Sequence, residues 1–275
     1  MWLRTSTLHG KLGKMRIALG IEYNGSGYCG WQSQSSGCGV QDHLENALNR
    51  FVASPALAVS VTCAGRTDAG VHARMQVVHF DCAVERDDES WVRGVNAYLP
   101  ASIRILWAKH VSDEFHARFS ARARRYRYVL LNDAVDTGIM RGLVGWFHTP
   151  LDVTAMRAAA LLLIGEHDFS AFRAAECQAK SAVKTLAEAD IITSGQLVTF
   201  TFCANAYLHH MIRNIVGGLV YVGAGRHSVS DFRRIFESRN RTLAAPTFAP
   251  DGLYLANIEY DQKFGLPAAS MRLPY

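Results

Sequence analysis

Apolar and polar positions along the chain follow two periods, a period of two typical of strands and a longer one typical of helices. Residues 16–23 alternate, with Ile17, Leu19 and Ile21 on one face, which predicts a strand. Residues 40–52 place their apolar side chains on one helical stripe, which predicts an amphipathic helix. Along the first part of the chain the pattern predicts, in order, strand 16–23, helix 40–52, strands 56–63 and 75–82, a capped helix within 87–100 that Pro100 ends, and strand 102–111.

The second part of the chain repeats this order without a repeat of the residues themselves. A helix is predicted over 152–165, with Asp152 as its N-cap and Gly165 at its end. A hairpin is predicted across Ser194 and Gly195. The full series is strand 124–131, helix 152–165, strands 186–193 and 196–204, an apolar helix 208–223, a shorter helix near 230–238, and strand 252–260.

The order β-α-β-β-α-β, found twice, is the ferredoxin-like plan. We therefore expect an α+β protein of two ferredoxin-like or RRM-like halves, with predominantly antiparallel sheets joined around a central cleft. The halves are expected at 15–118 and 119–275, with the junction inside 112–122, and residues 1–14 are expected to be a disordered leader. RNA-recognition modules share this topology, but topology alone does not define a function.

Composition supports a folded protein and narrows its surroundings. Of 275 residues, 49% are hydrophobic and 19% charged, and the formal net charge of +5 permits an anionic partner without proving one. No secretory signal opens the chain, and the apolar stretch 211–222 contains Arg213 and is too short to span a bilayer. The six cysteines include no C-x-x-C pair, so we expect reduced thiols in a cytoplasmic protein away from membranes.

The segment TCAGRTDAGVHARMQ, residues 62–76, sets one carboxylate among residues that a plain turn does not need. Asp68 lies between Arg66 and His72 and is flanked by two glycines. One interpretation is a turn aspartate that bonds its own backbone, with Gly70 supplying a positive φ. The other is a functional carboxylate, favoured because a turn needs no arginine. The segment alone leaves both open.

The segment FHARFSARARRYRY, residues 115–128, holds five arginines in ten residues, interleaved with aromatic side chains. Strand alternation places Tyr126 and Tyr128 on one face and Arg125 and Arg127 on the other. Arginine can donate two hydrogen bonds to a phosphate, and an aromatic ring can stack on a base, so the segment favours RNA binding. The alternative is a solvated basic edge strand.

Arg213 lies in MIRNIVGGLVYV, where nearly every neighbour is apolar. A buried guanidinium needs a carboxylate, and Asp68 from the other half is the candidate; the alternative is that Arg213 reaches solvent from a helix edge. His209 and His210 are adjacent and are expected to point in different directions on a helix, so we predict no metal site. The chain has no GxxxxGK, no GxGxxG after a strand and no HExxH, and no second carboxylate that glycosidase chemistry would require is evident.

With these residues in view, the chain resembles the tRNA pseudouridine synthase A family from Arg16 to Tyr260. The block GRTDAGVHA within 63–73 is the most specific part of this likeness. The matching motifs are GWQSQ (30–34), CAGRTDAGVHA (63–73), VNAYLP (95–100), FHARFSARARRYRY (115–128), GEHDFSAFR (165–173), ANAYLHHMIRNIVGG (204–218) and DGLYL (251–255).

The resemblance implies an isomerase that converts uridine to pseudouridine at positions 38, 39 and 40 of the tRNA anticodon stem-loop, as a homodimer and without a cofactor or a metal. It implies that Asp68 is catalytic, that Arg66 displaces and holds the target nucleotide, that Tyr126 stacks on the base and that Arg213 pairs with Asp68. It implies tRNA contacts from two segments, Phe115, His116, Ala117, Arg118 and Phe119 in one, and Glu176, Cys177, Gln178, Ala179 and Lys180 in the other.

One ionised carboxylate suits this chemistry, because it can attack the sugar, stabilise positive charge on it or remove a ribose proton within a closed pocket. Two alternatives remain at this point. A non-catalytic RNA-binding protein of two RRM-like modules would carry exposed aromatic RNP patterns, which the sequence lacks. A nucleoside hydrolase would leave abasic RNA instead of an isomer.

Overall fold

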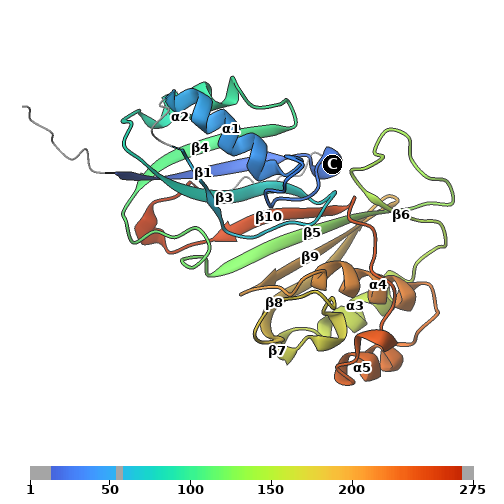
Figure 1. The fold of residues 1–275 in the computed structure, drawn as a ribbon. Coiled ribbons are helices and arrows are strands. Elements are labelled where there is room, and N and C mark those ends of the chain that lie inside the picture. The colour runs from blue at the N-terminus through green and yellow to red at the C-terminus, as the bar shows by residue number, and fades with distance from the viewer. Residues whose placement is uncertain (1–13, 54–57, 268–275) are drawn as a thin grey trace, which may run out of the picture.

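The structure is a computed structural model that describes residues 14–53 and 58–267. Its described strands form one continuous sheet in which β4, β1, β3, β10, β5, β9, β8 and β7 follow one another, while β2 pairs with β3 and β6 with β5 (Figure 1). The strands are β1 (Met15–Tyr23), β2 (Thr62–Cys63), β3 (His72–Cys82), β4 (Ile103–Val111), β5 (Ala123–Asn132), β6 (Gly145–Phe147), β7 (Gly165–Asp168), β8 (Val183–Ser194), β9 (Leu197–Ala204) and β10 (Leu253–Glu259).

Each half has the ferredoxin-like strand order that the sequence predicts. In the first half the order is β4-β1-β3-β2, and in the second it is β10-β5-β9-β8, so the fourth strand lies beside the first in both. The pairs within these two four-stranded orders are antiparallel, whereas the short β6 pairs with β5 in parallel. The predicted α+β class is confirmed, and the boundary between 118 and 119 stays a prediction. The leader lies outside the described residues except for Lys14.

The two halves join along the outer edge of β3. At the start of this strand His72 and Ala73 pair with β10 in parallel, and further along Val78 and His79 pair with β2. The connection from β2 to β3, residues 64–71, therefore begins and ends at the seam between the halves. Asp68 lies in this connection, as predicted from the sequence.

Helices cover each half separately (Figure 1). The helices are α1 (Val40–Val52) and α2 (Asp88–Asn96) in the first half, and α3 (Val153–Leu161), α4 (Met211–Gly223) and α5 (Val229–Glu237) in the second. Helix α4 is buried over most of its surface, which explains its apolar sequence. Its Gly217 lets the backbone of Pro246 approach, since a Cβ there would lie 2.3 Å from that carbonyl oxygen. No helix in the described part of the chain is long and apolar enough to cross a membrane.

One predicted strand is wrong in extent because side chains from a helix intervene. The strand predicted over 56–63 is a strand only at Thr62–Cys63. Side chains of α1 take the backbone N–H groups that a partner strand would have bound: Asn49 accepts from Val59 at 2.7 Å and Glu45 from Val61 at 2.9 Å. Residues 56 and 57 lie outside the described residues.

Several helix ends also differ from the prediction. Helix α3 begins after its N-cap Asp152 as expected, but it ends at Leu161 because Leu162 and Leu163 close tighter turns. Gly165, predicted to end that helix, instead begins β7 with φ +112°. Helix α2 ends at Asn96, well before Pro100, because the Asn96 side chain bonds the backbone of β4 at Ile105 in both directions. Strands β6 and β7 were not predicted.

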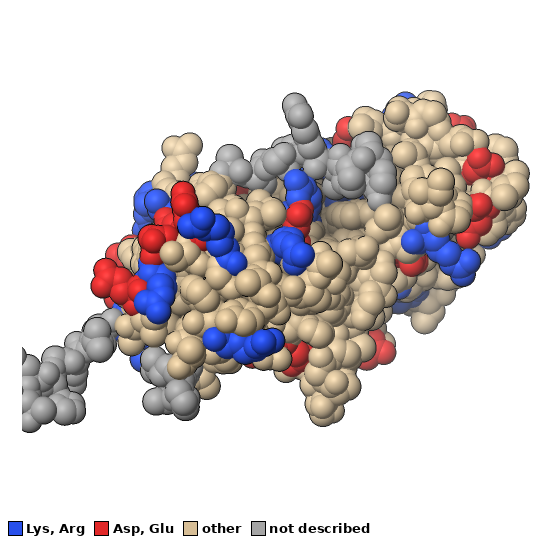
Figure 2. All heavy atoms as spheres, turned by 90° about the horizontal axis from the view of Figure 1, so that it is seen from above, with Lys and Arg blue, Asp and Glu red and all other residues tan. Residues whose placement is uncertain are grey.

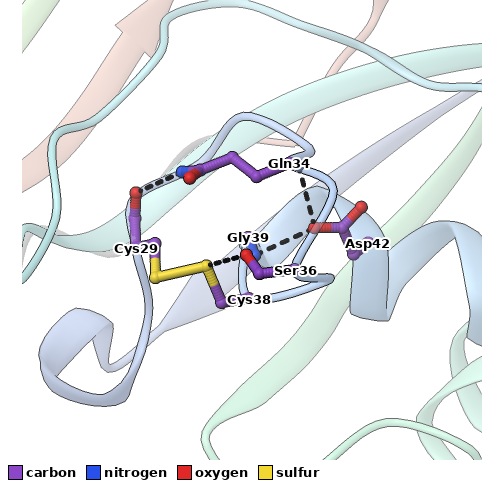
Figure 3. Close-up of a disulfide and its surroundings, with 6 residues drawn as sticks. All are labelled: Cys29, Gln34, Ser36, Cys38, Gly39 and Asp42. Carbon is purple, nitrogen blue, oxygen red and sulfur yellow. Dashed lines mark hydrogen bonds between the residues drawn. A yellow bond between two sulfur atoms is a disulfide. The ribbon is translucent and has the colours of Figure 1, made fainter.

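The prediction that all six cysteines are reduced is wrong for one pair. Cys29 and Cys38 form a disulfide across a turn, with their Cα atoms 5.5 Å apart (Figure 3). The turn is further closed by the Gln34 side chain, which donates to the carbonyl of Cys29 at 3.1 Å, and by Asp42, which accepts from the N–H of Gly39 at 2.9 Å. The other four cysteines are free thiols.

Candidate active site

A cavity of about 1020 Å³ opens where the two halves meet. Both halves line it. The first half contributes the β2–β3 connection and the turn after β1, and the second half contributes β5, the 176–179 loop and the residues before and within the first turn of α4. Four predicted site residues, Asp68, Arg66, Tyr126 and Arg213, line this cavity. The expected cleft between the halves is therefore present.

The loop that carries Asp68 is anchored on both sides of the carboxylate. Thr67 accepts a bond at its carbonyl from the N–H of Trp31 at 3.0 Å, and its hydroxyl meets that of Tyr23 at 2.8 Å. Val71 donates its N–H to the carbonyl of Asp68 at 3.1 Å, and Gly70 has φ +78°. The turn interpretation is thus correct for the backbone, and the rigid loop fixes where the side chain points.

The carboxylate of Asp68 leaves its own loop and meets the second half of the chain. Its Oδ2 lies 3.2 Å from Nη1 of Arg213 and 3.4 Å from Nε2 of His210, and its Oδ1 lies 3.4 Å from Nε2 of His209. The Asp68 side chain is 22% exposed. It is thus largely screened from water, yet it faces the cavity from one side.

Arg213 is held by two groups. Its Nη1 donates to Asp68, and its Nε donates to the carbonyl of Phe248 at 2.8 Å. Its side chain is only 14% exposed, so the alternative that it reaches solvent is wrong and the predicted pairing with Asp68 is confirmed. A buried charge without such partners would be strongly unfavourable.

His209 and His210 do not point apart as predicted. Helix α4 begins only at Met211, and His210 before it adopts the left-handed conformation, with φ +59°. Their rings lie 3.9 Å apart and both face Asp68. Burial lowers the pKa of His210, which favours its neutral form near neutral pH.

The ligand atoms of Asp68, His209 and His210 lie within 4.8 Å of one another, a donor set that a divalent cation could use. The guanidinium of Arg213 at Oδ2 opposes a second positive charge at the same carboxylate. These side chains therefore suit a site where a carboxylate acts beside two imidazoles better than a metal centre.

Arg66 belongs to the loop that carries Asp68, Tyr126 belongs to β5, and both line the cavity. Arg66 is exposed in the cavity, and no ion pair joins it to another described residue, so its guanidinium can meet an anionic ligand. Tyr126 is buried apart from the ring surface that reaches the cavity, and burial, with a smaller effect of the Asp68 charge, raises the pKa of its hydroxyl. Tyr207 packs edge-on against Tyr126 with ring centroids 5.1 Å apart, which fixes the ring.

The segment expected to contact tRNA divides into core and surface residues. Phe115 and Ala117 are fully buried, so their side chains are not available to RNA in this structure. Phe119 is 77% exposed and stacks on His116 with centroids 4.3 Å apart. Arg118 is exposed and lines the cavity.

The second such segment, residues 176–180, borders the cavity at its other side. Its first four residues line the cavity, whereas Lys180 is exposed and lies outside the lining. Arg173 holds the loop by donating to the carbonyls of Cys177 at 2.6 Å and Ala179 at 3.0 Å. The Cys177 thiol is buried and accepts the N–H of His209 at 3.3 Å.

Arg124 and Arg125 of β5 bond other parts of the chain and thereby stabilise the fold. Arg124 donates to backbone carbonyls, including that of Ala64 at 3.1 Å, and Arg125 pairs with Glu188. On the face drawn in Figure 2, basic side chains stand in small groups, several beside acidic ones, rather than in one broad patch. The density of arginine is therefore a weaker sign of RNA binding than the sequence suggests. Among the arginines that line the cavity, Arg66 and Arg118 are exposed, whereas Arg124 and Arg213 are partly buried.

Sequence reasoning missed three contributors to the site: Tyr207, the two histidines and the turn containing Trp31. The signal for His209 was its place two residues before α4, in ANAYLHHMIR, but the left-handed conformation of His210 could not be read from the sequence. Trp31 appears in the GWQSQ motif and is fully buried behind the Asp68 loop.

Comparison with known proteins gives consistent matches over most of the chain. The family model described as tRNA pseudouridine synthase matches residues 20–120 and 159–261. Proteins named tRNA pseudouridine synthase A are similar at 55% identity in Polaromonas naphthalenivorans (92% of this chain, 97% of the relative), 54% in Thiobacillus denitrificans (95% and 99%) and 52% in Methylobacillus flagellatus (94% and 98%).

Proposed function

The chain belongs to the tRNA pseudouridine synthase family, isomerases that convert uridine to pseudouridine in tRNA, and we propose that it does so with Asp68 as the catalytic carboxylate. We propose positions 38, 39 and 40 of the anticodon stem-loop as its targets. The observation that carries the proposal is one carboxylate, held by Arg213 at 3.2 Å, facing a cavity that both halves line.

The reaction breaks the bond between N1 of uracil and C1′ of ribose, turns the base and forms a bond between C5 and C1′. A carboxylate in the position of Asp68 can attack the sugar, stabilise positive charge at C1′ or take a ribose proton. A base held in the cavity beside Asp68 has limited room to escape once it is freed, and the bound RNA would keep bulk water away from the intermediate. Arg213 orients the carboxylate through its Nη1, while its Nε donates to the carbonyl of Phe248 and holds the guanidinium in place.

The target uridine must leave the helical stack before it can reach Asp68, at a cost of a few kcal/mol. Arg66, exposed beside Asp68, can hold the displaced phosphate or fill the gap in the stack. Tyr126 can stack on the base, and Tyr207 keeps that ring in place. Arg118, Phe119 and the 176–180 loop border the cavity or its rim and supply the remaining tRNA contacts.

We also propose that the working form is a cytoplasmic homodimer with the tRNA lying across both subunits. This follows from the family membership and from the nature of the substrate. Size-exclusion chromatography with light scattering tests it: a mass near twice 30.4 kDa is expected, and a monomer that is active at assay concentration would contradict it.

The proposal is tested by mapping pseudouridine in tRNA transcripts treated with the wild type, Asp68→Ala and Asp68→Asn, in the presence of EDTA and without added cofactor. We expect pseudouridine at positions 38 to 40 with the wild type only, while all three proteins bind the tRNA. Tight binding without any pseudouridine from the wild type would instead indicate a non-catalytic RNA-binding protein. Abasic product would indicate a hydrolase.

A further inference from the structure

The isomerisation requires that one further proton be moved, from C5 of uracil. When C5 of uracil bonds to C1′, C5 still carries its hydrogen. The C5–H bond must then break, its electron pair restores the C5–C6 double bond, and the proton goes to a base; N1, which lost the sugar, gains a proton. The step is redox-neutral and needs no co-reactant. The inference drawn from this step rests on the function proposed above.

We propose that His209 is the base that removes the C5 proton and passes it to solvent. Its Nε2 lies 3.4 Å from Oδ1 of Asp68, the oxygen not bound by Arg213. The imidazole lines the cavity, so a base bound against Asp68 would lie within its reach. Its side chain is 40% exposed, which gives the proton a path to water.

The position of His209 is fixed by its backbone rather than by its ring. Its N–H donates to the Cys177 thiol at 3.3 Å, and its carbonyl accepts the N–H of Ala174 at 3.1 Å. The loop that borders the cavity therefore holds this imidazole beside the catalytic carboxylate. Among the described residues the ring contacts Asp68 and the ring of His210, and no hydrogen bond from a third residue holds it, so it can turn toward a ligand.

Other groups at the cavity are less suited to accept this proton. Burial raises the pKa of the Cys63 thiol to about 11, so it stays protonated near neutral pH. The hydroxyl of Tyr126 is neutral for the same reason, and a neutral phenol is a weak base. His210 faces Oδ2, where the guanidinium of Arg213 disfavours a further positive charge.

The test compares His209→Gln with His210→Gln, its neighbour at the same 3.4 Å from the carboxylate, in single-turnover reactions on tRNA transcripts. The substrates carry hydrogen or deuterium at C5 of the target uridine. We expect little isotope effect for the wild type. His209→Gln should slow by roughly 10²–10⁴-fold, the usual contribution of a general base, and should show a clear primary isotope effect. His210→Gln should show none.

A third substrate, with 5-fluorouridine at the target, has no C5 proton to lose. Its consumption should proceed equally fast with the wild type and His209→Gln. A His209→Gln enzyme that is slow without an isotope effect, or equally slow on 5-fluorouridine, would overturn the assignment, because the residue would then act before the C5 step. An isotope effect in His210→Gln alone would assign the proton to the neighbour.

Circular dichroism and tRNA binding establish that the variants are folded, and His209→Asn serves as a second variant if the glutamine fails. Failure of the proposed function is separately visible, since the wild type would then form no pseudouridine at all. A wild type that forms pseudouridine beside a His209 variant of full rate would overturn only the present inference.

Discussion

The contact between Asp68 and Arg213 predicts a measurable coupling in stability between the two halves of the chain. The perturbation is a double-mutant cycle of Asp68→Asn, Arg213→Met and both together. Methionine keeps most of the apolar stem of Arg213 in place and removes its charge and its donors. Asparagine keeps the shape of Asp68 and removes its charge.

The magnitude follows from the two bonds of Arg213. Both bonds are donated by the charged guanidinium, and a hydrogen bond to a charged group contributes about 1.5–3 kcal/mol, less where it is long or open to water. The bond to Asp68 is long, at 3.2 Å, and the carboxylate is 22% exposed, so its contribution to the free energy of unfolding lies at the lower end of this range. The bond to Phe248 is short, at 2.8 Å, and should contribute fully. We therefore expect Arg213→Met to lower the free energy of unfolding by about 2–3 kcal/mol.

The coupling energy is what the cycle isolates, and we expect about 1.5 kcal/mol. It is measured by urea unfolding, with equal m-values required across the four proteins. The surface pair Glu89 and Arg93, 3.9 Å apart and more than three-quarters exposed on both sides, is the matched control and should couple by about 0.5 kcal/mol or less. Additivity of the Asp68 and Arg213 effects within about 0.3 kcal/mol would refute the pairing as a source of stability.

Three further predictions follow from other contacts. Reducing the disulfide of Cys29 and Cys38, which are nine residues apart, should lower the free energy of unfolding by about 2–3 kcal/mol, and melting curves that reductant leaves unchanged would contradict it. Tyr126→Ala should weaken tRNA binding by about 1–3 kcal/mol in a filter-binding titration, because the stacking ring is lost. Tyr126→Phe keeps the ring and should bind as the wild type does. An equal loss of binding in both variants would assign the effect to the hydroxyl. Burial lowers the pKa of His79 to about 4, and its Nδ1 accepts the N–H of Ala117 at 3.1 Å. Neutral His79 therefore stabilises the fold above pH 6.5, and this contribution is lost as the pH falls toward 4. The urea midpoint of His79→Asn should accordingly fall less steeply over that pH range than the midpoint of the wild type.

The fold could be predicted from the sequence wherever an element is long enough to show its period. The alternation of β1 and the apolar stripe of α1 are local signals, and each matches an element of the structure. Strands β6 and β7 have three and four residues, too few to display a period. The missing strand before Thr62 depends on side chains of α1 that reach it from more than ten residues away in sequence.

The site could be predicted in part because buried charge needs a partner. Arg213 in an apolar helix required a carboxylate, and Asp68 lay beside an arginine that a plain turn does not need, which made it the candidate. The facing histidines could not be predicted, since they depend on a left-handed backbone conformation at His210, which non-glycine residues adopt only rarely. The burial of Phe115 was also hidden, because its contacts with Tyr260 and Phe264 come from the far end of the chain.

The central claim is that Asp68 isomerises uridine in tRNA, and release of hydrogen from C5 tests it most directly. tRNA transcripts labelled with tritium at C5 of uridine would be treated with the wild type and with Asp68→Ala, and tRNA binding would be measured for both. The account predicts tritium in water from the wild type alone, arising from the anticodon stem-loop, with binding retained by the variant. Equal release by Asp68→Ala, or none from a wild type that binds the tRNA tightly, would contradict it.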